Sequence, residues 1–184
     1  GTPTSVSTGT YYIVANNGYC SDTAQINVVI NPKPSLVITD PAAVCSPVTI
    51  DLTNATITAG SNLEGGTLSY YTDAIAANVY STPTTADSAT YYIIVTTPQN
   101  CSDTAQVNII VNTKPNLVIT DPAHVCWPSM INLTTPEITN GSDLAGGILT
   151  YYSNPTVTAT QASPENVPTG RYYILATTTE SCTD

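Results

Sequence analysis

The residues best suited to chemistry in this 184-residue sequence are its five cysteines. Cys45 and Cys101 are 56 positions apart, and the same interval separates Cys126 from Cys182. Paired cysteines at a fixed interval predict disulfides formed in an oxidising compartment. We do not expect a zinc site, because two cysteines without a nearby histidine or a second cysteine pair cannot complete a tetrahedral shell.

The single histidine, His124, lies three positions before the single tryptophan, Trp127. A histidine and a tryptophan on one corner could stack on a sugar, so they form a candidate ligand patch. The alternative is ordinary sequence variation in a loop. Triad chemistry has little support, because no serine or cysteine nucleophile accompanies the one histidine. We therefore expect no catalytic residue and no enzyme activity.

Four aspartates are the remaining candidates for a binding site. Asp40 and Asp121 each precede a proline, and Asp22 and Asp103 each follow a Cys-Ser pair. Calcium takes about six to eight oxygen ligands, usually from clustered acids, and no run of alternating aspartates is present. Asp-Pro is also an ordinary turn former. We expect no cofactor and no metal, with Ca²⁺ as the alternative.

These residues belong to an internal repeat whose copies are offset by 81 positions, the difference between 34 and 115. Positions 34–103 match positions 115–184 without a gap, and 32 of the 70 pairs are identical. A third copy begins the sequence, where 11–14 and 20–25 match 91–94 and 101–106. We predict three parts: 1–32, the C-terminal hairpin of one repeat; 33–113, a complete repeat; and 114–184, a repeat that lacks its last strand. A repeat at fixed period indicates a structural or display role.

The repeat leaves the disulfide pairing open. One bond could close each repeat, as Cys45–Cys101 and Cys126–Cys182, and Cys20 would then pair upstream. Bonds could instead join neighbouring repeats, as Cys20–Cys45 and Cys101–Cys126, and reduced thiols are a third alternative. The bond within each repeat is preferred. One geometric objection stands against it, because the second strand of a sandwich often starts at the pole opposite its last hairpin turn.

Composition indicates an all-β chain and excludes several partners. Charged residues make up only 9% of the sequence, and 14 prolines and 10 glycines favour frequent turns. The net charge is −10, and Lys33, Lys114 and Arg171 are the only lysines and arginines. Nucleic acids and anionic membranes need clustered cations, so we exclude both as partners. No apolar run approaches the roughly 20 residues of a membrane span, so we expect no direct membrane insertion.

Hydrophobic periodicity predicts about seven short strands in each repeat. In 33–113 six of them can be placed, at 36–39, 48–52, 68–71, 78–80, 90–96 and 105–111. Within 90–96, Tyr91, Ile93 and Val95 share one face, as expected for a half-buried strand. About seven short strands in about 80 residues favour tandem immunoglobulin-like β-sandwich repeats.

Five motifs together resemble the immunoglobulin-like repeats of giant surface adhesins of Bacteroidetes, including flavobacterial gliding-motility adhesins. In this sequence they are Val44-Cys45-Ser46-Pro47, Gly65-Gly66, Tyr70-Tyr71, Thr90-Tyr91-Tyr92-Ile93 and Cys101-Ser102-Asp103-Thr104-Ala105. The resemblance implies export by the type IX secretion system, anchoring at the cell surface and a filamentous array. It also implies O-glycans on Asp-Ser/Thr motifs, with candidate sites at Thr23, Ser88 and Thr104.

The function expected from these observations is a structural and adhesive stalk of an extracellular, surface-anchored protein that mediates attachment or gliding. Its expected partners are a surface polysaccharide or an abiotic or cell surface, with lateral self-association of arrays as a further expectation. The alternative is an array of carbohydrate-binding modules that uses His124 and Trp127 as contacts.

Overall fold

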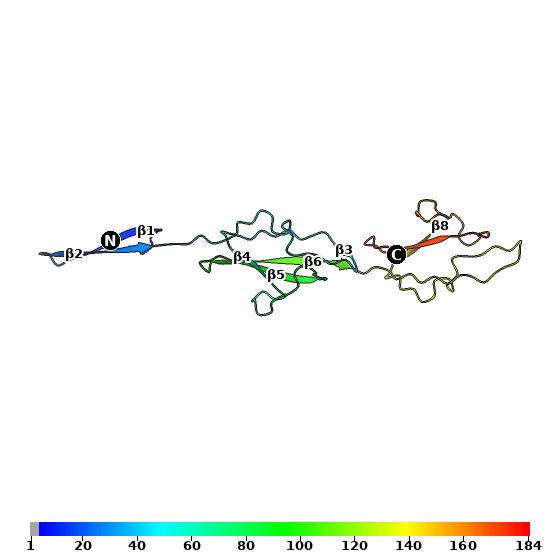
Figure 1. The fold of residues 1–184 in the computed structure, drawn as a ribbon, viewed down its shortest axis with the longest axis horizontal. Helices are drawn as coiled ribbons and strands as arrows, with labels where there is room; N and C mark the ends of the chain where they lie inside the picture. The colour runs from blue at the N-terminus through cyan, green and yellow to red at the C-terminus, as the bar shows by residue number, and fades with distance from the viewer. Residues whose placement is uncertain (1–3) are drawn as a thin grey trace. The chain divides into compact units, whose positions relative to one another are not determined.

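The computed structural model describes residues 4–184, which contain strands and loops but no helix (Figure 1). Strong β formers (Val, Ile, Thr and Tyr) and frequent turn residues account for this all-β structure. The strands are β1 (Gly9–Asn16), β2 (Ser21–Val28), β3 (Val44–Cys45), β4 (Thr67–Tyr71), β5 (Ala89–Thr96), β6 (Ser102–Ile109), β7 (Val111–Asn112), β8 (Ile148–Tyr152) and β9 (Tyr173–Thr177).

The first two strands form an antiparallel hairpin whose register pairs Gly9 with Val28 and Asn16 with Ser21. The turn is closed by side chains, because the Asn17 carboxamide oxygen accepts the N–H groups of Tyr19 and Cys20. The apolar side chains of this hairpin stay in contact with solvent: Tyr12, Ile13, Val14 and Ile26 are 64%, 62%, 59% and 47% exposed. None of the buried hydrophobic residues among 4–184 belongs to β1 or β2.

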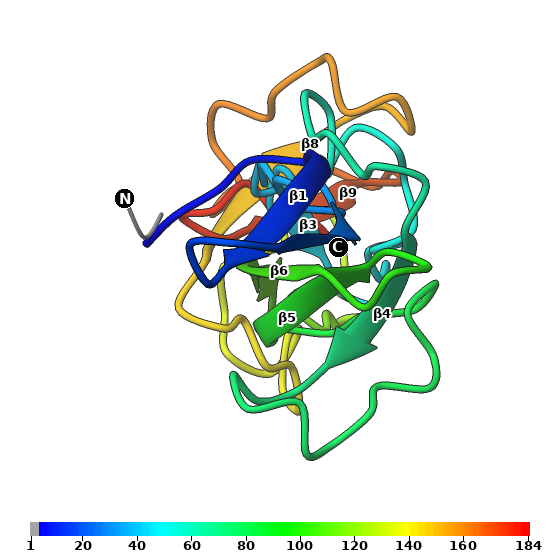
Figure 2. The same ribbon diagram turned by 90° about the vertical axis from the view of Figure 1, so that its left-hand side faces the viewer.

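Segment 33–113 holds a three-stranded sheet in the order β4-β5-β6, and Figure 2 shows β4 and β5 side by side. Strand β5 alternates as the sequence predicts, with Tyr91, Ile93 and Val95 at 5%, 0% and 0% exposed. Strand β6 buries Val107 and Ile109 in the same way. The expected strands at 68–71 and 90–96 are therefore confirmed, and the one expected at 105–111 is confirmed as far as Ile109, where β6 ends before β7 pairs with β3 in another sheet.

Two other expected strands, 36–39 and 48–52, are absent from the described structure. Residues 36–39 lie between Pro34-Ser35 and Asp40-Pro41, and the Ser61 hydroxyl accepts the Val37 N–H, so no ladder extends. At 48–52 only the bridge between Ile50 and Ala86 forms. The Asp51 carboxylate then accepts the Thr53 N–H and turns the chain.

Segment 114–184 reproduces these contacts one repeat later. Strand β8 pairs β9 in the register of β4 with β5, so Ile148 faces Thr177 as Thr67 faces Thr96. Its core consists of Leu133, Ile138 and Val167, with partly buried hydrophobic side chains packed around them. The two segments differ in one strand, because β5 has eight residues and β9 has five.

The chain divides into two compact units. The first contains residues up to Thr39 together with Asn54–Ser81 and Thr90–Val107, and the second contains Asp40–Thr53, Thr82–Ala89 and Asn108–Asp184. Part of segment 33–113 thus groups with segment 114–184. The repeat boundaries at 32/33 and 113/114 stay a prediction from the sequence.

Candidate functional site: a cross-linked junction

A disulfide joins Cys45 to Cys182, and so links segment 33–113 to segment 114–184. Their Cα atoms lie 5.6 Å apart, within the usual range for a disulfide. Cys45 lies in β3, which pairs in parallel with β7 just before the sequence that connects the two segments. Cys182 follows β9 and is only 1% exposed. The two cysteines are 137 positions apart in the sequence.

Neither pairing expected from the sequence forms, since Cys20, Cys101 and Cys126 are free thiols in the structure. The preferred Cys45–Cys101 bond fails for a geometric reason. Cys45 lies opposite Asn112, whereas Cys101 precedes the far end of β6. At about 3.3 Å per residue, the strand between them spans roughly 33 Å, and a disulfide needs Cα atoms closer than about 7 Å.

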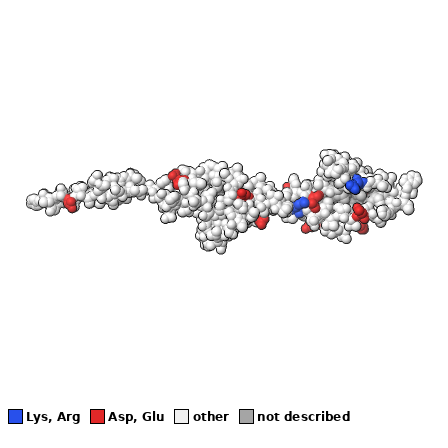
Figure 3. Space-filling model, in the orientation of Figure 1, with Lys and Arg blue, Asp and Glu red and all other residues white. Residues whose placement is uncertain are grey.

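A lysine and an aspartate form an ion pair next to this disulfide. The Lys114 ammonium lies 2.6 Å from the Asp184 carboxylate, whose other oxygen accepts the Leu117 N–H at 2.7 Å. The Lys114 ammonium first, and the Leu117 N–H second, lower the pKa of Asp184 below its ordinary value. Charged side chains are sparse on the face shown in Figure 3.

The same arrangement occurs one repeat earlier. Lys33 lies 3.0 Å from Asp103, and the Leu36 N–H donates to that carboxylate at 2.9 Å. The Leu36 N–H is the largest cause that lowers the pKa of Asp103, followed by the Lys33 hydrogen bond. Sequence reasoning missed both pairs. The signal was available, because Lys33 and Lys114 precede their aspartates by the same interval of 70 positions.

Ser46 and the backbone complete the junction around Cys45. The Ser46 hydroxyl accepts the Lys114 N–H at 3.0 Å, and the Ser46 N–H donates to the Asn112 carbonyl at 2.9 Å. A shallow cavity of about 570 Å³ lies beside them, lined by Ser88, Ile110, Val111, Asn112, Thr113, Asp143, Ala145 and Glu180. One disulfide and several hydrogen bonds thus fix the connection between the segments.

The aspartates considered for calcium do not meet. Asp103 is engaged with Lys33 and Leu36, and the Asp40 carboxylate accepts the Asn108 N–H at 2.8 Å and the Asn108 side-chain amide at 3.2 Å. Among residues 4–184, no group of three or more His, Cys, Asp or Glu side chains is placed to hold a metal ion.

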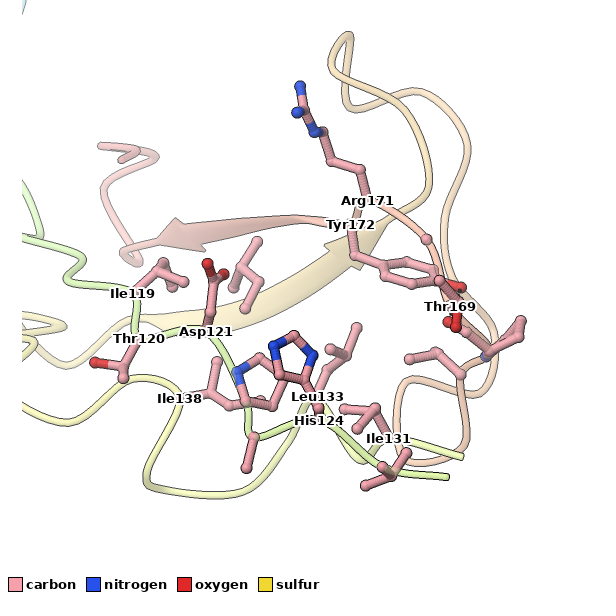
Figure 4. A pocket seen from close by; sticks show the side chains of 17 residues that line it. Ile119, Thr120, Asp121, His124, Ile131, Leu133, Ile138, Thr169, Arg171 and Tyr172 are labelled. Atoms are coloured by element: carbon pink, nitrogen blue, oxygen red, sulfur yellow. Dashed lines mark hydrogen bonds between the residues drawn. The ribbon is translucent and has the colours of Figure 1, made fainter. Parts of the chain in front are cut away.

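The side chains of His124 and Trp127 lie in different environments. His124 lines a groove of about 490 Å³ in segment 114–184, and Figure 4 shows it pointing into the groove with Asp121. Trp127 does not line this groove and is 91% exposed. At the equivalent position of segment 33–113, Ser46 is half-buried at the junction. The structure therefore does not gather the two residues into one lined site.

The candidate glycosylation residues differ in how free their hydroxyl groups are. Thr23 on β2 and Thr104 on β6 are exposed. The Ser88 hydroxyl is occupied, because it accepts the Val111 N–H at 2.6 Å and donates to the Val111 carbonyl at 3.0 Å. A glycan on Ser88 would break both bonds. Modification at all three sites stays a prediction.

No protein-family model matches the chain, and no curated protein matches it significantly. The part of the chain that the structure describes contains no helix long and apolar enough to cross a membrane.

Proposed function

We propose that this chain is a stalk segment of an extracellular, surface-anchored adhesin, built from tandem immunoglobulin-like repeats that carry tension. The observation that carries the proposal is the Cys45–Cys182 disulfide, because it ties two copies of the sequence repeat to each other. A bond within one repeat would stabilise only that repeat. A bond between repeats gives tension a covalent route that bypasses the residues it encloses.

The same pattern of bonds between repeats accounts for the free thiols of Cys101 and Cys126. Cys101 and Cys126 are the equivalents of Cys182 and Cys45 in the neighbouring copies of the repeat. In an array of such repeats, we assign Cys101 to a bond with the preceding repeat and Cys126 to a bond with the following one. Each repeat is then linked covalently to both of its neighbours.

Stretching single molecules between their ends tests the load-bearing part of the proposal. The oxidised chain should extend much less than the reduced chain, by the length that the disulfide encloses. Equal extension before and after reduction would contradict the stalk function. The adhesive part is tested by coating beads with the oxidised chain and measuring their retention on polysaccharide and abiotic surfaces under flow.

A carbohydrate-binding array is the second candidate, and the 91% exposure of Trp127 is the observation that favours it. An exposed indole ring is a suitable surface for stacking on a sugar. A glycan array tests this candidate with Trp127→Ala, and Tyr19→Ala is the matched control because Tyr19 is 97% exposed. Specific binding that only Trp127→Ala removes would favour this candidate over the stalk.

A further inference from the structure

The sequence contains two Asn-Gly pairs, Asn17-Gly18 and Asn140-Gly141. In such a pair the backbone nitrogen of the glycine can attack the carboxamide carbon of the asparagine and close a cyclic succinimide. Glycine favours this reaction because it has no side chain to hinder the approach and because its backbone is free to adopt the required conformation. The sequence alone therefore gives both pairs the same chemistry.

The two pairs also share their exposure and their backbone geometry. Both asparagines are exposed, and φ is +91° at Gly18 and +88° at Gly141, a region that glycine adopts readily. A Cβ built on either glycine would meet no atom within 4 Å. Segment 33–113, which contains the whole of β6, has Ala59 at the position of Asn140, and Ala59 is exposed too. The exposure of Asn140 is therefore a property of this turn of the repeat.

Hydrogen bonds distinguish the two pairs, and those at Asn17 oppose ring closure. The Asn17 carboxamide oxygen accepts the Tyr19 N–H at 3.0 Å and the Cys20 N–H at 2.9 Å. The Gly18 N–H donates to the side-chain oxygen of Asn16 at 2.7 Å. To react, the carboxamide must leave its two donors and the Gly18 nitrogen must give up a proton that Asn16 holds. All of these partners lie in one turn, so the protection does not depend on the rest of the molecule.

The Asn140 pair is not held in this way. Among the hydrogen bonds within residues 4–184, none involves the Asn140 carboxamide or the Gly141 N–H. Its turn is closed from the two ends instead, because the Ser142 N–H donates to the Thr139 carbonyl at 3.1 Å. The carboxamide carbon and the attacking nitrogen can therefore meet without the loss of a hydrogen bond.

We propose that Asn140 is a site of spontaneous deamidation in the folded protein, whereas Asn17 is protected. The Gly141 nitrogen loses its proton to solvent and bonds to Cγ of Asn140, the Cγ–Nδ2 bond breaks, and ammonia leaves. Water then opens the succinimide at either carbonyl and gives aspartate or isoaspartate. Each conversion adds one negative charge to a chain whose net charge is −10. The proposal goes beyond the stalk function and does not rest on it.

The isoaspartate product would alter the contacts of the 139–142 turn, because its main chain runs through Cβ and is longer by one methylene. The turn is fastened by the Ser142 hydroxyl, which accepts the Val118 N–H at 2.8 Å and donates to the Val118 carbonyl at 3.0 Å. Next to it, Asn116 and Asp143 exchange backbone hydrogen bonds at 2.7 and 2.9 Å. Conversion should loosen these bonds in segment 114–184 alone, because Ala59 of the other segment cannot deamidate.

Peptide mapping by mass spectrometry tests the proposal on the folded, oxidised protein, incubated at mildly alkaline pH with its free thiols blocked. Asn140 should convert faster than Asn17 by roughly tenfold or more, because only ring closure at Asn17 breaks hydrogen bonds. Isoaspartyl methyltransferase should label the same Asn140 peptide. In the reduced, denatured chain both sites should convert at similar rates. Asn140→Gln is the matched control, since its longer side chain keeps the carboxamide but closes a ring far more slowly.

A second variant tests the cause of the protection. Asn16→Ala removes the acceptor of the Gly18 N–H and should speed conversion at Asn17, while Asn140 keeps its rate. Hydrogen exchange at the Val118 N–H should be faster in the aged parent than in aged Asn140→Gln, and unchanged exchange would refute the loosening of the turn. The proposal is overturned if the folded chain converts both sites equally, converts Asn17 faster, or converts neither. It is also overturned if the denatured chain keeps the difference seen in the folded one.

Discussion

Reduction of the Cys45–Cys182 disulfide should release a defined length of chain under force. The bond encloses 137 residue intervals, and an extended chain spans about 3.5 Å per residue, so about 480 Å is hidden while the bond is intact. Single molecules held at both ends in optical tweezers should therefore extend about 480 Å further after reduction. Cys182→Ser should show the longer extension without reductant.

The same measurement discriminates between the pairings. A Cys45–Cys101 bond encloses 56 intervals, or about 200 Å, and a Cys101–Cys126 bond encloses 25, or about 90 Å. Cys101→Ser is the matched control, because it removes an equivalent but free thiol and should leave the length unchanged. If Cys101→Ser alone lengthened the oxidised chain by about 200 Å, and Cys182→Ser did not lengthen it, the junction described above would be refuted.

Three further predictions follow from single side chains. The pKa of Asp103 lies below its ordinary value of 3.8, so its bonds stabilise the fold above about pH 4, and this stability is lost as the pH falls further. The denaturant concentration at the unfolding midpoint should therefore fall less with decreasing pH in Asp103→Asn than in the parent. The exposed Glu137→Gln is the control. A Cβ on Gly147 would lie 2.5 Å from the Thr177 carbonyl oxygen, so Gly147→Ala should lower stability by about 1–3 kcal/mol in chemical denaturation. Gly170→Ala, which meets only a tyrosine ring at 3.2 Å, should cost less, and equal losses would contradict the packing. Glycopeptide mass spectrometry of material secreted by a glycosylating host should find any glycans on Thr23 and Thr104 rather than on Ser88. The Ser88 hydroxyl both donates a hydrogen bond to the Val111 backbone and accepts one from it. Glycan occupancy at Ser88 equal to that at Thr104 would contradict this prediction.

Local sequence patterns predicted those parts of the fold that depend on residues close to one another in the sequence. The alternation in β5 follows from apolar side chains at every second position, and Tyr91, Ile93 and Val95 are buried as expected. Segment 48–52 has the same alternation but does not form a strand. The Asp51 side chain competes for a backbone N–H there, and only Ile50 finds a bridging partner. In this segment the alternation identified one buried side chain, Leu52 at 1% exposed, whereas Val48 is 55% exposed.

The disulfide could not be predicted from the spacing of the cysteines, because the interval between its two cysteines is the sum of an interval within one repeat and the length of one repeat. The 137 positions between Cys45 and Cys182 are the 56 within one repeat plus the 81 of the repeat itself. A reading confined to one repeat, or to adjacent cysteines, does not include this pairing. The decisive quantity is the length of β6 and β7, which places Cys101 about 33 Å from Cys45 along the sheet.

Extended to an array of repeats, this pairing gives two interleaved covalent routes. A bond from the preceding repeat would enter this chain at Cys101, and a bond to the following repeat would leave it at Cys126. On that route only the 25 residue intervals between these two cysteines carry tension. They span about 90 Å of extended chain, whereas the backbone of two whole repeats would span about 570 Å. Those residues include β6, β7 and the Lys114 connection, while the other route crosses the same junction through Cys45–Cys182. If one disulfide is reduced, the second route still bypasses most of the folded chain. An array cross-linked in this way should therefore lengthen little when one disulfide is reduced and much more when bonds on both routes are reduced, whereas repeats with internal bonds would each release their length independently.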